Sequence, residues 1–117
     1  MLTERLKTKR KNKVAIVMEL KNIQKQCYDM VKEVDKKCNC NHDIDTTFIH
    51  LIEEVGEVAR LIIDEKIDRD KLDKNHLGEE FADIFFFLSR LANHYDIDLE
   101  KAIKQKLNKL KDRFEVK

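Results

Sequence analysis

Residues 50–62, HLIEEVGEVARLI, have the pattern of an amphipathic helix with an acidic side. At about 100° per residue, the apolar side chains fall on one face and the charged ones on the other. The charged face gathers His50, Glu53, Glu54, Glu57, Arg60 and Asp64. Like charges one turn apart cost only about 0.2–0.5 kcal/mol on an exposed face. For this helix alone, a solvated face and a cation-binding face therefore both remain open.

The rest of the chain is also helical in pattern. Of its 117 residues, 40% are charged, two are glycine and none is proline, a composition that favours long helices. No segment shows the strict apolar–polar alternation of a half-buried strand. We predict an all-α fold, a bundle of about four helices. The expected helices cover residues 12–36, 47–65, 77–95 and 98–115, with a loop at 37–46 and a polar connection within 64–78.

The helix starts can be predicted from side chains that accept hydrogen bonds from free backbone N–H groups. Asp45, Thr46 or Thr47 is expected to cap the second helix, and Asp96 or Asp98 the fourth. We expect one domain over residues 1–117 with a small core, in which residues 1–13 form a basic extension.

Composition also limits the location and the partners. No apolar run reaches the roughly 18–20 residues of a membrane span, and the N-terminus lacks the apolar stretch of a signal peptide. We therefore expect a cytoplasmic protein with no membrane contact. Three cysteines are too few and odd in number for a disulfide framework. A net charge of +1 does not indicate a partner by itself.

The third predicted helix carries acids where burial is expected. EEFADIFFFLSRLANH, residues 79–94, holds four of the six phenylalanines, so apolar residues cover most of its circumference. Glu80 projects among apolar neighbours, and Asp83 lies close to it around the helix. An unpaired buried carboxylate costs several kcal/mol, so both acids need a cation or a proton. Arg90 and His94 could pair with Asp83 instead, but they lie too far along to serve Glu80.

The two acidic helices each present a pair of carboxylates three residues apart, and such pairs share one helix face. The pairs are Glu54 with Glu57 and Glu80 with Asp83. If the helices are antiparallel neighbours, four carboxylates point into one space, and such oxygen ligands suit Mg²⁺ or Mn²⁺. A di-iron centre would need Glu-x-x-His pairs, which the motif lacks.

The segments EEVGE (53–57) and EEFAD (79–83) resemble the Glu-Glu-x-x-Glu…Glu-x-x-Asp pattern of the MazG-like, all-α nucleoside triphosphate pyrophosphohydrolases. The resemblance covers about residues 16–114. It implies Mg²⁺-dependent hydrolysis of a nucleoside triphosphate to the monophosphate and pyrophosphate, with Mn²⁺ as a substitute ion. By position it implies the metal ligands Glu54, Glu57, Glu80 and Asp83. Glu53 would be a further catalytic acid that holds a second ion or orients the attacking water.

The resemblance also implies basic contacts to the phosphates. KLNKLKDRF, residues 106–114, is similar to the family's last helix, so Lys106 and Arg113 are expected to bind substrate, with a solvated helix edge as the alternative. Many members have an asparagine where this chain has Leu110. His50 could touch phosphate or pair with the acids. The chain has no tryptophan to stack on a base; the candidates are Tyr28, Phe48 and His42.

Other functions fit the sequence less well. Phosphoribosyl-ATP pyrophosphohydrolase has similar acidic helices, but its Tyr-His after the second acidic motif is replaced here by FFFLSRL. A non-catalytic helical dimerisation module would leave Glu80 and Asp83 unexplained. Cys38, Cys40 and His42 have a zinc-like spacing but lack a second ligand pair, so ordinary cysteines in a polar loop are expected. Residues 1–13 lack aromatic residues between the basic ones, so nucleic acid is not an expected partner.

Assembly is predicted from size. Four helices and a wet acidic cleft leave a thin core for one chain, so apolar helix faces should be buried against another copy. Members of the family commonly form dimers or tetramers, some with sites completed across the interface. We expect a homodimer or homotetramer.

Overall fold

The computed structural model describes residues 19–40 and 43–117, and in this part of the chain every regular element is a helix. The elements are α2 (Leu20–Cys38), α3 (Ile44–Lys66), α4 (Lys74–His94) and α5 (Leu99–Arg113). The predicted all-α fold of about four helices is confirmed. The predicted helical residues 12–18, the basic extension and His42 lie outside the described residues. None of the described helices combines the length and hydrophobicity needed to cross a bilayer.

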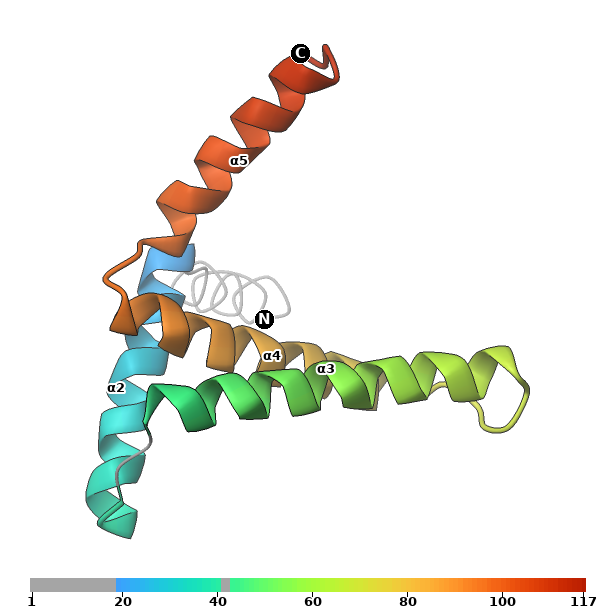
Figure 1. Ribbon diagram of the computed structural model, residues 1–117, viewed down its shortest axis with the longest axis horizontal. Coiled ribbons are helices and arrows are strands. Elements are labelled where there is room, and N and C mark those ends of the chain that lie inside the picture. The colour runs from blue at the N-terminus through green and yellow to red at the C-terminus, as the bar shows by residue number, and fades with distance from the viewer. Residues whose placement is uncertain (1–18, 41–42) are drawn as a thin grey trace, which may run out of the picture.

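Figure 1 shows an elongated pair of helices, α3 and α4, which is called the arm below. α3 and α4 are antiparallel and pack along their length, joined by the connection at residues 67–73. α2 crosses this pair at one end and contacts α4. α5 contacts the start of α2 and then projects away from the arm, so the C-terminus lies far from it. The antiparallel pairing of α3 and α4 is the arrangement on which the predicted acidic site depends.

Asp43 sets the start of α3. Its Oδ1 accepts a hydrogen bond from the backbone N–H of Thr46 at 2.7 Å, which satisfies one of the free donors of the first turn. Thr47 is fully buried and donates from Oγ1 to the carbonyl of Asp43 at 2.9 Å. The predicted caps at Asp45, Thr46 or Thr47 are therefore wrong, because these residues already lie inside the first turn.

Aspartates also cap the next two helices. Asp73 Oδ1 accepts from the N–H of Asn75 at 2.9 Å, so α4 starts earlier than predicted and the polar connection is shorter. Asp98 Oδ1 accepts from the N–H of Lys101 at 3.2 Å, which confirms it as the cap of α5. The turns use left-handed residues other than glycine, at Asn39, Asp68, Asp96 and Glu115. Asn and Asp tolerate this conformation better than most residues.

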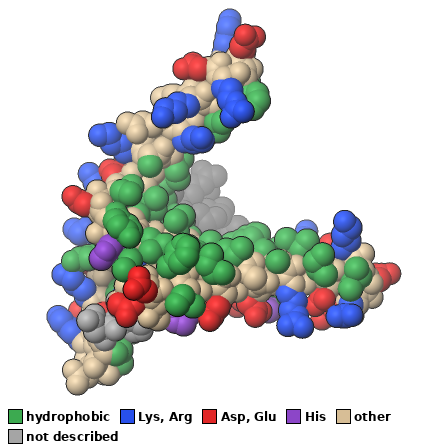
Figure 2. Space-filling view, viewed as in Figure 1, with side chains coloured by type: hydrophobic (Ala, Val, Ile, Leu, Met, Phe, Trp, Pro, Cys, Tyr) green, Lys and Arg blue, Asp and Glu red, His purple; other side chains and the backbone are tan. Residues whose placement is uncertain are grey.

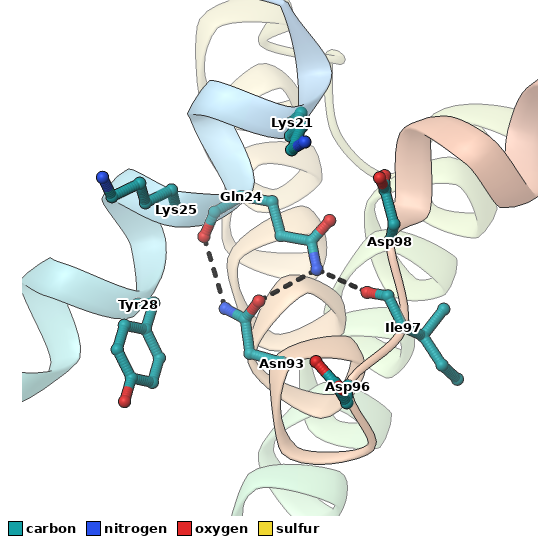
Figure 3. Close-up of a pocket in the computed structure, with 8 residues that line it drawn as sticks. All are labelled: Lys21, Gln24, Lys25, Tyr28, Asn93, Asp96, Ile97 and Asp98. Atoms are coloured by element: carbon teal, nitrogen blue, oxygen red, sulfur yellow. Dashed lines mark hydrogen bonds between the residues drawn. The ribbon is translucent and has the colours of Figure 1, made fainter.

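A hydrogen-bonded glutamine joins α2 to α4 and to the start of α5 (Figure 3). Gln24, almost fully buried, donates from Nε2 to Asn93 Oδ1 at 2.9 Å and to the carbonyl of Ile97 at 2.7 Å. Its Oε1 accepts from the N–H of Leu99 at 2.9 Å. Asn93 Nδ2 returns a bond of 3.3 Å to the carbonyl of Gln24. These contacts fix the direction in which α5 leaves the arm.

The apolar core of the single chain is very small. Among the described residues only Gln24, Thr47, Ser89 and Ala92 are buried, and only the last is apolar. Phe81 is 52% exposed and Phe85–Phe87 are half-buried, so the prediction of a largely buried third helix is wrong for one chain. Figure 2 shows apolar side chains exposed along the α3–α4 arm and on α5. Extensive exposed apolar surface often marks a site of contact with another protein.

Cys38 and Cys40 form a disulfide across the left-handed Asn39 at the end of α2, with their Cα atoms 5.2 Å apart. The expected loop starts later than predicted, because Cys38 is still part of α2. The third cysteine, Cys27, is free and half-buried. One bridge of this span closes a single turn and is not a framework that holds the helices together.

Candidate metal centre

The predicted acids line one open cleft between α3 and α4. The cleft has a volume of about 700 Å³ and is lined by Glu53, Glu54, Gly56, Glu57, Arg60, Glu80 and Asp83. α3 supplies the first five of these residues and α4 the last two. The spacing of three or four residues keeps the acids of each helix on the face turned toward the other helix.

Three of these carboxylates are close enough to bind one cation together. Glu54, Glu80 and Asp83 each offer an oxygen atom, and these atoms lie within 4.8 Å of one another. Glu57 lines the same cleft but does not belong to this closest group. Three oxygen donors at this separation suit a hard divalent cation such as Mg²⁺.

Glu54 responds to the crowding of negative charge. A hydrogen bond with Glu80 raises the pKa of Glu54 to about 7 from its ordinary 4.5, and desolvation and the charges of Glu80, Asp83 and Glu57 add to this effect. A proton on Glu54 thus relieves the repulsion between neighbouring carboxylates near neutral pH. A divalent cation would do the same with two charges.

Glu80 is largely enclosed. Its side chain is only 13% exposed, and its Oε1 lies 3.3 Å from Nε2 of His76, one turn earlier in α4. Its Oε2 is buried and has no hydrogen-bond partner among the described residues. A buried carboxylate oxygen without a partner is costly. Such an atom needs a partner, which the protonated Glu54 carboxyl or a metal ion could supply.

Glu53 contacts His50 at the outer side of the cleft. The distance from His50 Nδ1 to Glu53 Oε2 is 3.3 Å, and both side chains are largely exposed. The imidazole also stacks on the ring of Phe87, with centroids 5.7 Å apart and planes at 20°. The structure thus shows the pairing of His50 with an acid, one of its two expected roles.

Comparison with known proteins agrees with this geometry. Residues 42–116 match the model of the MazG nucleotide pyrophosphohydrolase domain. The chain belongs to the MazG family. It is also similar to the uncharacterized protein YvdC of Bacillus subtilis, with 36% identity over 74 residues that cover 56% of this chain and 70% of the relative. No solved structure matches the chain significantly.

The basic residues expected from the MazG pattern lie elsewhere in the chain. Lys106 and Arg113 are exposed on α5, and they are not among the described residues that line the acidic cleft. The guanidinium of Arg113 lies over the ring of Phe114, 5.4 Å from its centroid. Within one chain, α5 does not bring these cations to the acids.

The residues expected to pair with Asp83 or to stack on a base also lie away from the acidic cleft. Arg90, His94 and Tyr28 line a separate cleft between α2 and α4, so the alternative pairing of Asp83 with Arg90 or His94 finds no support here. Tyr28 is exposed with Lys32 Nζ 4.5 Å from its ring centroid, and Phe48 is 53% exposed on α3. Neither ring belongs to the lining of the acidic cleft.

Two residues near the MazG acids were missed by sequence reasoning as members of the site. His76 contacts Glu80, and Arg60 lines the cleft. His76 stands four residues before Glu80, a spacing that places the two on one helix face. It was missed because the helix was expected to start at residue 77, after the histidine.

Proposed function

We propose that this protein hydrolyses a nucleoside triphosphate, with either ribose or deoxyribose, to the monophosphate and pyrophosphate in a Mg²⁺-dependent reaction. The convergence of carboxylate oxygens from Glu54, Glu80 and Asp83 in one cleft, in a chain of the MazG family, carries the proposal. A triphosphate bears about four negative charges, so an acidic cleft accepts it only together with cations. Cytoplasmic location, where nucleotides and Mg²⁺ are available, belongs to the same proposal.

Four carboxylates would hold the ion: Glu54, Glu57, Glu80 and Asp83. The unpartnered Oε2 of Glu80 and the raised pKa of Glu54 support this assignment, because both reflect negative charge that is uncompensated without an ion. A bound Mg²⁺, or Mn²⁺ in its place, supplies charge stabilisation for the phosphate oxygens and lowers the pKa of a bound water.

Glu53 is the acid best placed to orient the attacking water. It lines the cleft but lies outside the closest group of three, and its contact with His50 holds its carboxylate in one direction. In the proposed reaction, the water oxygen forms a bond to the α-phosphorus, and the bond to the bridging oxygen breaks to release pyrophosphate. A second ion held by Glu53 and a phosphate contact from His50 are further roles within this proposal.

We propose that a homodimer, or a homotetramer built from it, completes the site. The radius of gyration is 18.5 Å, whereas a compact domain of this length has roughly 13 Å. The projecting α5 exposes Ile103, Leu107 and Phe114 as an apolar stripe. Packing of this stripe on another copy would bring Lys106 and Arg113 toward that copy's cleft, where they would hold phosphates.

A substrate panel tests the reaction. The purified protein is incubated with nucleoside triphosphates, their deoxy counterparts and phosphoribosyl-ATP in the presence of Mg²⁺, and the products are separated by anion-exchange chromatography. We expect monophosphate and pyrophosphate, and no turnover in EDTA until Mg²⁺ or Mn²⁺ is restored. Diphosphate with orthophosphate would indicate a different reaction, and full activity in chelator would exclude the metal mechanism.

A further inference from the structure

Glu80 is held differently from the other acids of the cleft. Its side chain is 13% exposed, whereas that of Glu53, the other acid paired with a histidine, is 64% exposed. One of its oxygens, Oε1, lies 3.3 Å from His76 Nε2. The other, Oε2, is buried without a hydrogen-bond partner among the described residues. The histidine therefore occupies one oxygen and leaves the enclosed one for a cation, on the side of the carboxylate cluster that includes Glu54.

The position of His76 is itself fixed. It lies in the first turn of α4, and its backbone N–H donates to the capping Asp73 Oδ1 at 3.4 Å. The next turn of the same helix carries Glu80, so the imidazole and the carboxylate share one face. The 3.3 Å contact places Nε2 within reach of Oε1, and Nε2 is a hydrogen-bond donor whenever it carries a ring proton.

We propose that His76 is a positioning residue of the metal centre, which holds Oε1 of Glu80 and thereby presents Oε2 to the cation. The inference rests on the proposed function, since it needs a metal ion in the cleft. Carboxylates that bind metals are commonly oriented by a hydrogen bond to the oxygen that does not ligate. Without His76, the Glu80 side chain loses one restraint, which metal binding must then supply.

Two other roles for His76 make different predictions. A solvent-exposed ion pair between histidine and glutamate would contribute little to stability and nothing to metal affinity. If His76 were a direct metal ligand, its ring nitrogen would bind the ion, and the amide of a glutamine could not replace it. If His76 is a positioning residue, it acts only through its N–H donor, which a glutamine side chain also carries.

The test compares three variants with the wild-type protein. His76→Ala removes the donor, and His76→Gln restores an N–H on a side chain of similar reach. His94→Ala is the matched control, because His94 ends the same helix and lines the separate cleft toward α2. Mn²⁺ affinity is measured by isothermal titration calorimetry without nucleotide, and melting temperature is measured with and without Mn²⁺.

We expect His76→Ala to weaken Mn²⁺ binding by about 10–100-fold, with a smaller Mn²⁺-dependent rise in melting temperature and an unchanged melting temperature in EDTA. His76→Gln should recover most of the affinity, and His94→Ala should match the wild type. Wild-type affinity in His76→Ala would overturn the proposal, as would equal loss in the alanine and glutamine variants, which would make His76 a ligand. If the wild-type protein itself binds no Mn²⁺, the metal-dependent function fails together with this inference.

Discussion

At the scale of single residues, a substitution at Glu80 distinguishes a metal site from a structural pair of charges. Its substitution by glutamine keeps the shape and removes the charge. If Glu80 is a ligand, the metal-free protein loses a repelled, enclosed charge, so its free energy of unfolding should stay level or rise while turnover falls by orders of magnitude. Urea unfolding and steady-state kinetics measure the two effects, and Glu65→Gln, in an exposed position near the end of α3, serves as the control.

A stabilising role for Glu80 gives the opposite result. If the carboxylate mainly held a buried salt bridge, its removal would cost roughly 3–5 kcal/mol. A Glu80→Gln protein that is strongly destabilised but active once folded would therefore contradict the assignment. The wild-type protein should also gain about 2.7 kcal/mol of stability at Mg²⁺ concentrations a hundredfold above the Kd, which the variant should lose.

The raised pKa of Glu54 predicts how the stability of the metal-free protein depends on pH. Because its folded pKa is raised from 4.5 to about 7, the folded state binds more protons than the unfolded state between these values. Stability should therefore fall as pH rises through this window. The melting temperature in EDTA, recorded from pH 5 to 8, should decline in the wild type and more weakly in Glu54→Gln. Equal slopes in the two proteins would show that another group titrates.

At the scale of helices, three aspartate caps and one glutamine determine the arrangement. The caps end the loops at Asp43, Asp73 and Asp98, and this fixes which residues of α3 and α4 face each other across the cleft. Gln24 then joins α2 to the end of α4 and the start of α5 through side-chain hydrogen bonds. The direction of α5 depends on this one buried side chain.

Replacement of Gln24 by alanine should destabilise the protein by about 2–4 kcal/mol, because it removes the side-chain hydrogen bonds and leaves the N–H of Leu99 and the Oδ1 of Asn93 without these partners. Gln26→Ala, on an exposed face of the same helix, is the control and should change stability by less than about 0.5 kcal/mol. Chemical denaturation measures both. Equal effects of the two substitutions would mean that the buried contacts do not hold α5.

At the scale of the whole molecule, the exposed apolar surface supports the proposed assembly. A single chain that buries so few side chains has little hydrophobic stabilisation, so the folded state should depend on assembly. Size-exclusion chromatography with light scattering should give the mass of a dimer or tetramer, and the melting temperature should rise with protein concentration. A stable monomer at micromolar concentration would contradict the proposed assembly.

Complementation tests whether α5 serves the cleft of another copy. Glu80→Gln lacks a proposed metal ligand, and Arg113→Ala lacks a proposed phosphate contact, so each homo-oligomer should be nearly inactive. Co-refolded mixtures contain mixed assemblies in which one cleft has both an intact acidic set and an intact partner α5. We expect activity to recover to a substantial fraction of one wild-type site. No recovery, with mixed assembly verified by native mass spectrometry, would place the phosphate contacts within one chain.

The sequence by itself determined the helical class, the approximate helix positions and the two acidic motifs, because periodicity and side-chain type report on neighbours within about four residues. It placed helix starts less well, since Asp43, Asp45, Thr46 and Thr47 all have capping side chains and only the folded first turn shows which one bonds. The meeting of Glu54 with Glu80 could be anticipated from the antiparallel pairing of two adjacent helices. The bonds of Gln24 to Asn93 and Leu99, the exposure of the phenylalanine-rich helix and the separation of α5 from the cleft were decided only by tertiary structure. These features join residues far apart in the chain, and their energies depend on how whole helices pack rather than on any local pattern.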